Sequence, residues 1–338
     1  MSTALAIKQL VDRQDLSSLV MASAVREIMS GGSSPAQIAA FLTALRMKGE
    51  SVVEIAAAAQ VMRELADPVR VRGEVLDIVG TGGDGVNSFN VSTAASLVCA
   101  AAGVAVAKHG NRSVSSQSGS ADVLEAAGAY LELSCEQVAS CLERCSFGFM
   151  FAPRHHSAMR HAAPIRRELG IRTVFNLLGP LTNPAGATRN VIGVYDRRWL
   201  RPLAEVLLAL GSTRALVVHS LDGMDELSIA APTLACELRD GKIREFTVEP
   251  QSLGMTAAPL AALKVANAGE SLAVLRSVLS GTPGAAMEMV ALNAGAGLYI
   301  AGRVEHLAGG IALAREILQA GQGLHCLEKY VALTQEFR

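Results

Sequence analysis

One stretch of the sequence, residues 75–128, constrains the fold of this chain more than any other. Residues 75–79 (VLDIV) form a short apolar run rich in β-branched side chains, which predicts a buried strand. GTGGD follows at residues 80–84, and its glycines let the backbone turn sharply and approach a ligand with no Cβ in the way. Successive N–H groups in such a turn form a concave site for an anion.

A helix and a second strand follow the glycine turn. NVST at residues 90–93 opens an Ala-rich helix that stops at Gly103; its Ser and Thr suit an N-cap, and a helix N-terminus favours phosphate. Residues 104–107 predict a strand that ends in KHGNRSVSS, residues 108–116, which supplies two cations, a histidine, an amide and three hydroxyls. Because parallel strands bind ligands at their carboxyl edge, both segments predict one site for a multiply phosphorylated molecule.

The glycine turn would be weak evidence by itself, since many such turns only connect two elements. GTGGD is not G-x-G-x-x-G, because the third glycine is missing, and it is not the P-loop pattern. Its combination with residues 90–93 and 108–116 favours a binding site.

The motifs of this region resemble one known family. GTGGD, FNVST, KHGNRSVSS and GSADVLE, in this order and spacing, are similar to the anthranilate phosphoribosyltransferases. The resemblance continues through residues 149–185, 222–228 and 292–302 and covers essentially the whole chain. It implies transfer of the phosphoribosyl group of 5-phosphoribosyl-1-diphosphate to the amine of anthranilate, giving N-(5-phosphoribosyl)anthranilate and pyrophosphate. This reaction is the second step of tryptophan biosynthesis from chorismate.

The fold class follows from the order of predicted elements. Residues 1–70 carry only helical signals, with helices beginning near Ser34 and Ser51, and residues 67–73 predict a linker. From residue 74 to 338 strands alternate with helices. We therefore expect a small N-terminal all-helical domain and a larger α/β domain with a central, mostly parallel sheet flanked by helices. The resemblance adds that a segment near residues 165–185 packs on the helical domain.

Local patterns place the remaining elements of the α/β part. Strands are predicted at 147–151, 190–195 and 214–219, with a hairpin at 233–248 that turns at residues 240–241. Helices are predicted at 120–127, with Ser120 as the cap, and at 157–169, at 199–210 and from about 262 to the end. A capping box at 134–137 predicts the start of one more helix.

Composition excludes several classes of function. A formal net charge of -1 argues against a general nucleic-acid or anionic-membrane binder, which needs a basic surplus. The uncharged run at residues 91–107 is too short and too rich in small residues for a membrane span, and the N-terminus lacks a signal-peptide core. Six cysteines form neither C-x-x-C nor a zinc pattern. We expect a reduced, cytoplasmic protein with no nucleic-acid or membrane partner.

Phosphoribosyl transfer sets three physical demands. The leaving pyrophosphate must be neutralised, usually by Mg²⁺; the cationic ribosyl centre needs a polar, water-poor pocket; and the nucleophile must be held in line. An adjacent Asp–Glu pair such as Asp225–Glu226 is ordinarily a solvated loop. Here the resemblance implies that both carboxylates are Mg²⁺ ligands, that Ser92 is a further ligand, and that two Mg²⁺ ions bind.

The resemblance also implies which residues contact each substrate. Contacts with phosphoribosyl diphosphate are expected from Gly80, Gly83, Asp84, Ser88, Asn90, Val91, Ser92, Thr93, Lys108, His109, Gly110, Asn111, Arg112, Ser113, Val114, Ser115, Ser116 and Ser120. Contacts with anthranilate are expected from Gly80, Asn111, His156, Arg166, Gly179 and Pro180. The catalytic residues are expected to be Lys108, His109, Asn111 and Arg166, with Arg166 holding the carboxylate of anthranilate. Neither histidine need be a base, because an aromatic amine attacks as the neutral species.

The same residues bear on two alternative functions and on the oligomeric state. A pyrimidine nucleoside phosphorylase shares the fold, but its family has KHSTGG where this chain has IVGTGG at residues 78–83. A non-catalytic, nucleic-acid-binding relative would lose the Mg²⁺ and lysine positions, all of which this chain keeps. The resemblance further implies a homodimer formed through the helical domain, although periodicity alone does not separate a subunit contact from an intramolecular core.

Overall fold

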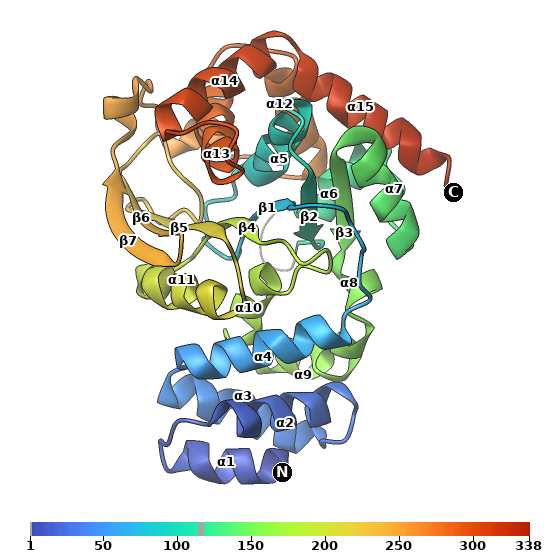
Figure 1. The fold of residues 1–338 in the computed structure, drawn as a ribbon, viewed down its shortest axis with the longest axis vertical. Helices are drawn as coiled ribbons and strands as arrows, with labels where there is room; N and C mark the ends of the chain where they lie inside the picture. The colour runs from blue at the N-terminus through green and yellow to red at the C-terminus, as the bar shows by residue number, and fades with distance from the viewer. Residues whose placement is uncertain (1, 114–117) are drawn as a thin grey trace.

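The computed structural model describes residues 2–113 and 118–338 and shows a helical bundle beneath an α/β part (Figure 1). The bundle contains α1 (Thr3–Val11), α2 (Ser18–Met29), α3 (Pro35–Lys48) and α4 (Val52–Leu65). The helix starts predicted near Ser34 and Ser51 are confirmed, because both residues form capping boxes. The Ser51 hydroxyl accepts from the N–H of Glu54, whose carboxylate accepts from the N–H of Ser51.

One seven-stranded sheet forms the centre of the α/β part. Its strands are β1 (Leu76–Gly80), β2 (Val106–Gly110), β3 (Phe147–Phe151), β4 (Arg189–Gly193), β5 (Arg214–Ser220), β6 (Thr233–Arg239) and β7 (Lys242–Val248). The order is β3-β2-β1-β4-β5-β6-β7, parallel through β5 and antiparallel for β6 and β7. The expected mostly parallel sheet is thereby confirmed. The strand order reverses direction at β1, and ligands of open α/β sheets bind at such a switch point.

Helices cover both faces of the sheet, as Figure 1 shows. Seven helices of the described chain lie on the upper face or at the β3 edge of the sheet: α5 (Val91–Ala101), α6 (Ser120–Ala126), α7 (Cys135–Cys145), α12 (Ala268–Leu279), α13 (Ala285–Ile300), α14 (Leu307–Gln319) and α15 (Gln322–Gln335). On the opposite face α11 (Leu200–Ala209) packs between β5, β6 and α4. Gly297 lets α13 approach the sheet, since a Cβ there would lie 2.7 Å from Cys99 Sγ and Ile78 Cδ1.

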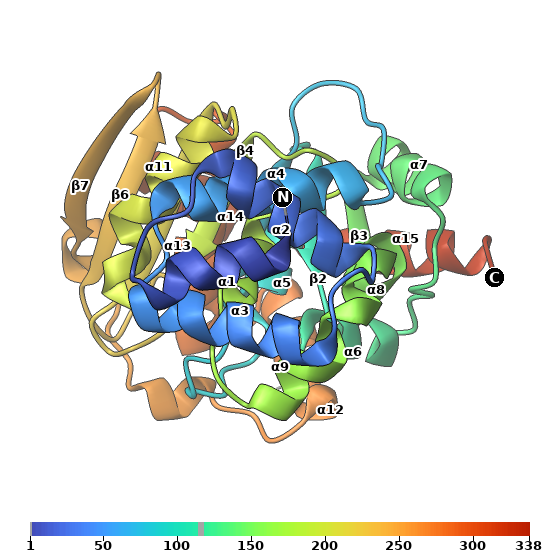
Figure 2. The same ribbon diagram turned by 90° about the horizontal axis from the view of Figure 1, so that it is seen from below.

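A broken helical segment joins the two parts. It comprises α8 (Ala152–His155), the 3₁₀ turn η1 (Ser157–His161), α9 (Ala163–Leu169), α10 (Phe175–Leu178) and the 3₁₀ turn η2 (Gly179–Leu181). Phe175 and Leu177 share a hydrophobic cluster with the bundle residues Phe41 and Ile55. Figure 2 shows α9 beside α3, on the surface of the bundle. The short 3₁₀ turns η3 (Arg197–Trp199), η4 (Pro250–Leu253) and η5 (Leu260–Leu263) complete the element list.

The structure corrects several local predictions. Residues 157–169 do not form one helix: η1 and α9 meet at Ala162, because Pro164 has no N–H to continue a helix and instead begins a new one. The second strand is Val106–Gly110 rather than 104–107, since Ala107 through Gly110 pair with β3. The helix caps also differ: Asn90 and Gly119 precede α5 and α6.

The described residues contain no helix with both the length and the apolar sequence needed to cross a membrane.

Candidate functional site

The glycine turn leaves β1 directly beneath a loop that carries two carboxylates. Gly82 and Gly83 have φ values of 71° and 77°, which side chains with a Cβ rarely adopt. The N–H of Gly82 donates to Asp225 Oδ2 at 2.6 Å. A Cβ on Gly80 would collide with the same oxygen, so glycine is required there by close approach. Asp84 shapes the turn by accepting from the N–H of Val86 at 3.1 Å.

Asp225 and Glu226 follow β5 and turn back over the ends of β1 and β4. Gly193 ends β4, and a Cβ there would collide with the carbonyl oxygen of Asp225. Glu226 Oε1 accepts from the N–H of Ser92, in the first turn of α5, at 3.1 Å. Glu226 Oε2 is buried and has no hydrogen-bond partner. The predicted carboxylate pair therefore lies between the glycine turn and the start of α5.

Lys108 brings a positive charge to these carboxylates from inside the sheet. Its side chain is 1% exposed, and its Nζ donates to the carbonyl of Ile78 at 2.6 Å and to Ser92 Oγ at 3.3 Å. The sequence predicts Lys108 in a loop after the strand, but the residue lies within β2. The strand holds its ammonium in one place, which a loop would not do.

Burial sets the electrostatics of this cluster. Desolvation, followed by the charge of Asp84, raises the pKa of Asp225 to about 7. The pKa of Glu226 is raised well above its ordinary value by burial and then by Asp225 and Asp84. Burial lowers the pKa of Lys108 to about 8, against the opposing charges of Asp77 and Glu226. Carboxylates so close together and short of partners are stabilised by a bound cation.

The donor set fits Mg²⁺. Asp225, Glu226 and Ser92 offer the hard oxygen ligands that this ion prefers, and the unpartnered Glu226 Oε2 is free to coordinate. No group of three or more His, Cys, Asp or Glu side chains in residues 2–113 and 118–338 is placed to hold a metal ion. Mg²⁺ characteristically takes one or two protein carboxylates and completes its shell with water and substrate phosphate.

Other residues predicted to contact phosphate serve the local structure. Asn90 ties α5 to two neighbouring segments: its Oδ1 accepts from Ser118 Oγ at 2.9 Å and from Ser271 Oγ at 2.7 Å. Val91 is fully buried, which leaves only its backbone for a ligand. Thr93 Oγ1 is buried without a partner, and Ser88 forms an isolated bridge with Lys264.

The segment after β2 folds back on the start of α6. The carbonyl of Asn111 accepts from the N–H of Ala121 at 3.2 Å, and Ser120 Oγ donates to the same carbonyl at 3.5 Å. Arg112, which the resemblance places in contact with phosphoribosyl diphosphate, forms ion pairs with Asp122 and Glu125. These carboxylates neutralise its positive charge. Other predicted contacts are the Ser113 N–H, which donates to Asp122, and Gly110, which ends β2. Val114, Ser115 and Ser116 lie outside the described residues.

Two histidines meet at the junction of the sheet and the broken helical segment. The rings of His109 and His156 are 5.0 Å apart, and His109 Nδ1–H donates to the carbonyl of Gly179 at 3.1 Å. Because Nδ1 carries the proton in this contact, the neutral ring keeps a lone pair on Nε2, which is buried without a partner. The structure thus joins three predicted site positions, His109, His156 and Gly179, with the buried Pro180 next to Gly179.

Both histidines are expected to stay neutral at physiological pH. Burial, then the charge of His156, lowers the pKa of His109 to about 3; burial, then His155, lowers the pKa of His156 to about 4. In an NMR titration of the free enzyme from pH 5.5 to 8, their ring resonances should therefore not move. His109→Asn and His156→Asn variants assign the signals. A titrating His109 resonance in this range would contradict the buried, neutral ring.

The broken helical segment carries two arginines of interest, Arg166 and Arg172, of which only Arg172 contacts the glycine turn in the described structure. Arg166, on α9, lies over the ring of Phe175 at 5.1 Å, and burial lowers its pKa. Arg172 donates to the carbonyl of Gly83 and lies over the ring of Tyr195 at 3.7 Å. In the described part of the chain no hydrogen bond or ion pair joins Arg166 to Lys108 or His109. Arg172 therefore makes the direct link from this segment to the glycine turn.

Sequence reasoning missed the residues that hold the site together. Asp77 and Asn183 form a buried pair beneath His109, and Arg172 links the glycine turn to Tyr195. Asp77 had a signal, since it is the only charged residue in an apolar strand sequence. Arg172 had none, because arginines on or near helix surfaces are common.

Comparisons with known proteins agree with this geometry. Residues 5–66 match the helical bundle domain of a glycosyl transferase family, and residues 72–324 match its a/b domain. The chain is 54% identical over 334 residues to the anthranilate phosphoribosyltransferase of Halorhodospira halophila, covering 98% of each chain. It superposes with a TM-score of 0.93 on the crystal structure of the Thermus thermophilus anthranilate phosphoribosyltransferase, at 48% identity, covering 98% of this chain and 99% of that chain. The Saccharomyces cerevisiae anthranilate phosphoribosyltransferase in complex with PRPP and Mg is similar over 99% of this chain and 98% of that chain, with a TM-score of 0.91 and 28% identity.

Proposed function

This chain belongs to the anthranilate phosphoribosyltransferases of that glycosyl transferase family, and from this membership we propose how its residues perform the reaction. It transfers the phosphoribosyl group of 5-phosphoribosyl-1-diphosphate to the amine of anthranilate. One observation carries the proposal: Ser92 contacts both Lys108 Nζ and Glu226 Oε1. The start of α5, the lysine ammonium and the carboxylates therefore lie together at the end of β1.

The diphosphate would bind over Ser92, Lys108 and Glu226. The turn at Gly82 and Gly83 lets the backbone approach the diphosphate without a Cβ, and the positive end of the α5 dipole lies at the same carboxylates, because the Ser92 N–H donates to Glu226. Lys108 adds a fixed ammonium. Two Mg²⁺ ions, held by Asp225, Glu226 and Ser92, would neutralise the charge that develops on the departing pyrophosphate. The charge balance supports two divalent ions, since Asp84, Asp225 and Glu226 add negative charge to that of the diphosphate.

Anthranilate would bind on the side of the broken helical segment. Arg166 would hold its carboxylate, with Asn111 as a further contact, and Gly179 and Pro180 would form one wall. The amine nitrogen then forms a bond to C1 of the ribose as the C1–O bond to pyrophosphate breaks, and the electron pair of that bond leaves with pyrophosphate. His109 and His156 line the pocket as neutral rings, and Nε2 of His109 can accept a hydrogen bond from the amine. The amine loses its extra proton after attack.

The reaction is tested by the fluorescence of anthranilate. Mixed with 5-phosphoribosyl-1-diphosphate and Mg²⁺, the protein should remove the fluorescence at a rate that requires both substrates and vanishes with EDTA. Persistence of the fluorescence with folded protein and Mg²⁺ would contradict the assigned reaction. Nucleosides with phosphate are the next substrates to test in that case.

Arg166→Ala is expected to raise the KM for anthranilate about a hundredfold, because a charge-assisted hydrogen bond to a carboxylate is worth about 1.5–3 kcal/mol. The KM for 5-phosphoribosyl-1-diphosphate should change little. Arg167→Ala, the neighbouring arginine on α9, is the matched control. Equal effects of the two substitutions would show that Arg166 does not bind the carboxylate.

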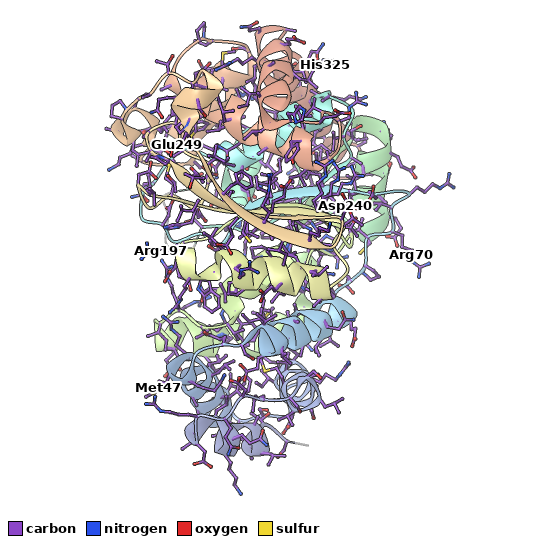
Figure 3. All side chains as sticks on the ribbon, turned by 60° about the vertical axis from the view of Figure 1, so that its left-hand side comes forward. Met47, Arg70, Arg197, Asp240, Glu249 and His325 are labelled. Carbon is purple, nitrogen blue, oxygen red and sulfur yellow. The ribbon has the colours of Figure 1, made fainter. Side chains whose placement is uncertain are left out.

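A homodimer through the helical domain is supported by exposed apolar side chains. Of the nine exposed large hydrophobic residues in the described chain, six lie between residues 5 and 65. Val11 is 69% exposed and Met47 73%, and Figure 3 shows Met47 at the surface of the helical part. Their concentration in the helical part makes that part the candidate surface for a subunit contact.

Val11→Asp combined with Met47→Asp should convert a dimer into a monomer, because a dimer would bury both new charges. Sedimentation velocity measures the outcome. Leu208→Asp, at an exposed leucine on α11, is the control and should leave the mass unchanged. A monomeric unmodified protein would rule out the proposed dimer. A cytoplasmic location is also proposed, since all six cysteines are free, as in a reducing compartment.

A further inference from the structure

Asp77 is a buried carboxylate that the proposed reaction does not use. It lies in β1 and is 0% exposed. Its Oδ1 accepts from the N–H of His109 at 3.3 Å, and its Oδ2 accepts from Asn183 Nδ2 at 2.7 Å. Asp77 therefore contacts both a neighbouring strand and the loop that follows η2.

Asn183 extends this connection. Its Nδ2 also donates to the carbonyl of Ala107 at 2.8 Å, and its Oδ1 accepts from the N–H of Ala185 at 2.9 Å. Asn183 is 3% exposed, so these groups have no water to replace a lost partner. The loop is thus held against β1 and β2 at one end by Asn183, and at the other by the bond from His109 Nδ1 to the Gly179 carbonyl.

The buried carboxylate of Asp77 is not explained by a contribution to the stability of the fold. Burying it costs free energy that an apolar residue of similar size would not incur, and buried ionic groups are often neutral or unfavourable for stability. The neighbouring β1 residues Leu76 and Ile78 are apolar and buried, as expected of a core strand. The contacts of Asp77 are instead directed: each oxygen fixes one donor, and both donors belong to segments that line the anthranilate side.

We propose that Asp77 is a positioning residue, which acts through Asn183 and the His109 backbone to fix residues 179–183 against β2 and so set the dimensions of the anthranilate pocket. The inference rests on the proposed assignment of His109, Gly179 and Pro180 to that pocket. Asp77 contacts no substrate. Loss of its contact with Asn183 should therefore loosen the fit of anthranilate more than it affects the binding of the diphosphate.

Asn183→Ala and Asp77→Asn test the proposal by steady-state kinetics with each substrate varied in turn. Both should raise the KM for anthranilate about tenfold, because a buried polar group loses its partner. Asn183→Ala should also leave the KM for 5-phosphoribosyl-1-diphosphate within about twofold, whereas Asp77→Asn in addition removes a charge that acts on Lys108. Asn183→Ser keeps a hydroxyl donor and should recover part of the loss. Asn190→Ala is the matched control: Asn190 is equally buried in β4, but bonds to Ala187 and Ser212 rather than to this loop.

Thermal unfolding of each variant separates positioning from general destabilisation. A similar loss of Tm in Asn183→Ala and Asn190→Ala, with the KM for anthranilate raised only in the former, supports the proposal. Equal KM changes for both substrates in Asn183→Ala, or the same rise in the KM for anthranilate in Asn190→Ala, would overturn it. Arg166→Ala keeps the two inferences distinct: if that variant raises the KM for anthranilate and Asn183→Ala does not, positioning by Asp77 fails while the substrate assignment stands. If a variant does not fold, Asn183→Ser carries the test.

Discussion

Replacing Asp225 by asparagine and Glu226 by glutamine together should lower kcat by about a thousandfold or more, since metal charge stabilisation is worth several kcal/mol and each 1.36 kcal/mol is tenfold in rate. The two amides keep the shape of the loop. Their carbonyl oxygens could still accept from the N–H groups of Gly82 and Ser92, as the carboxylates do now. The loss would therefore be one of charge and metal affinity, and the fold should persist.

The same double variant should be more stable than the unmodified protein when Mg²⁺ is absent. The pKa of Asp225 rises from its ordinary value to about 7 on folding, so the folded state holds a proton that the unfolded state has released. That contribution to stability is lost as pH rises through about 7, and at pH 8 a buried charge destabilises the fold. The amides carry no charge, so the Tm at pH 8 in EDTA should increase.

Three measurements separate metal binding from other roles of the pair: turnover with saturating Mg²⁺, Tm with and without Mg²⁺, and calorimetric titration of Mg²⁺ in the presence of 5-phosphoribosyl-1-diphosphate. Asp222→Asn is the control from the same loop, because Asp222 accepts from Ser228 Oγ and from the N–H of Met224. It should leave turnover within about threefold of the unmodified enzyme. Near-normal turnover of the double variant would remove Asp225 and Glu226 from the metal site.

Lys108→Met should lower kcat/KM for 5-phosphoribosyl-1-diphosphate by about a hundredfold to a thousandfold, since a buried charge acts in a low-dielectric site where it is worth several kcal/mol. Methionine keeps most of the length and apolar volume of the lysine stem. The Nζ of Lys108 is held by Ile78 and Ser92, so its charge is already in place before substrate binds. The fold should tolerate the change, because desolvating that ammonium carries its own cost.

Steady-state kinetics with the diphosphate substrate varied measures the Lys108 effect, and circular dichroism checks the fold. Lys329→Met, on the exposed side of α15, is the matched control and should have unmodified kinetics. The KM for anthranilate should change much less than that for the diphosphate. If Lys108→Met weakened only the binding of anthranilate, Lys108 would belong to the anthranilate pocket and not to the diphosphate site.

Much of the fold could be predicted from local sequence. Short apolar runs and glycine turns indicated the parallel strands, and Ser34 and Ser51 indicated the helix starts, because capping depends on a few adjacent residues. Strand boundaries were harder to predict: Lys108 and His109 are polar, yet they continue β2 because β3 supplies their backbone partners. A single helix over 157–169 was wrong for the local reason that Pro164 interrupts it.

The sequence by itself determined the chemistry that this chain offers: a glycine turn, a lysine after an apolar strand, a carboxylate pair and an arginine, all carried by motifs of the family. Only the tertiary structure decided which of them meet. The bond from Ser92 to Glu226 joins residues 134 positions apart, and Asn183 reaches Asp77 across 106. Such contacts follow from the order of strands in the sheet and from the packing of the broken helical segment. No local pattern encodes either of them, because each depends on what the rest of the chain brings to the same edge.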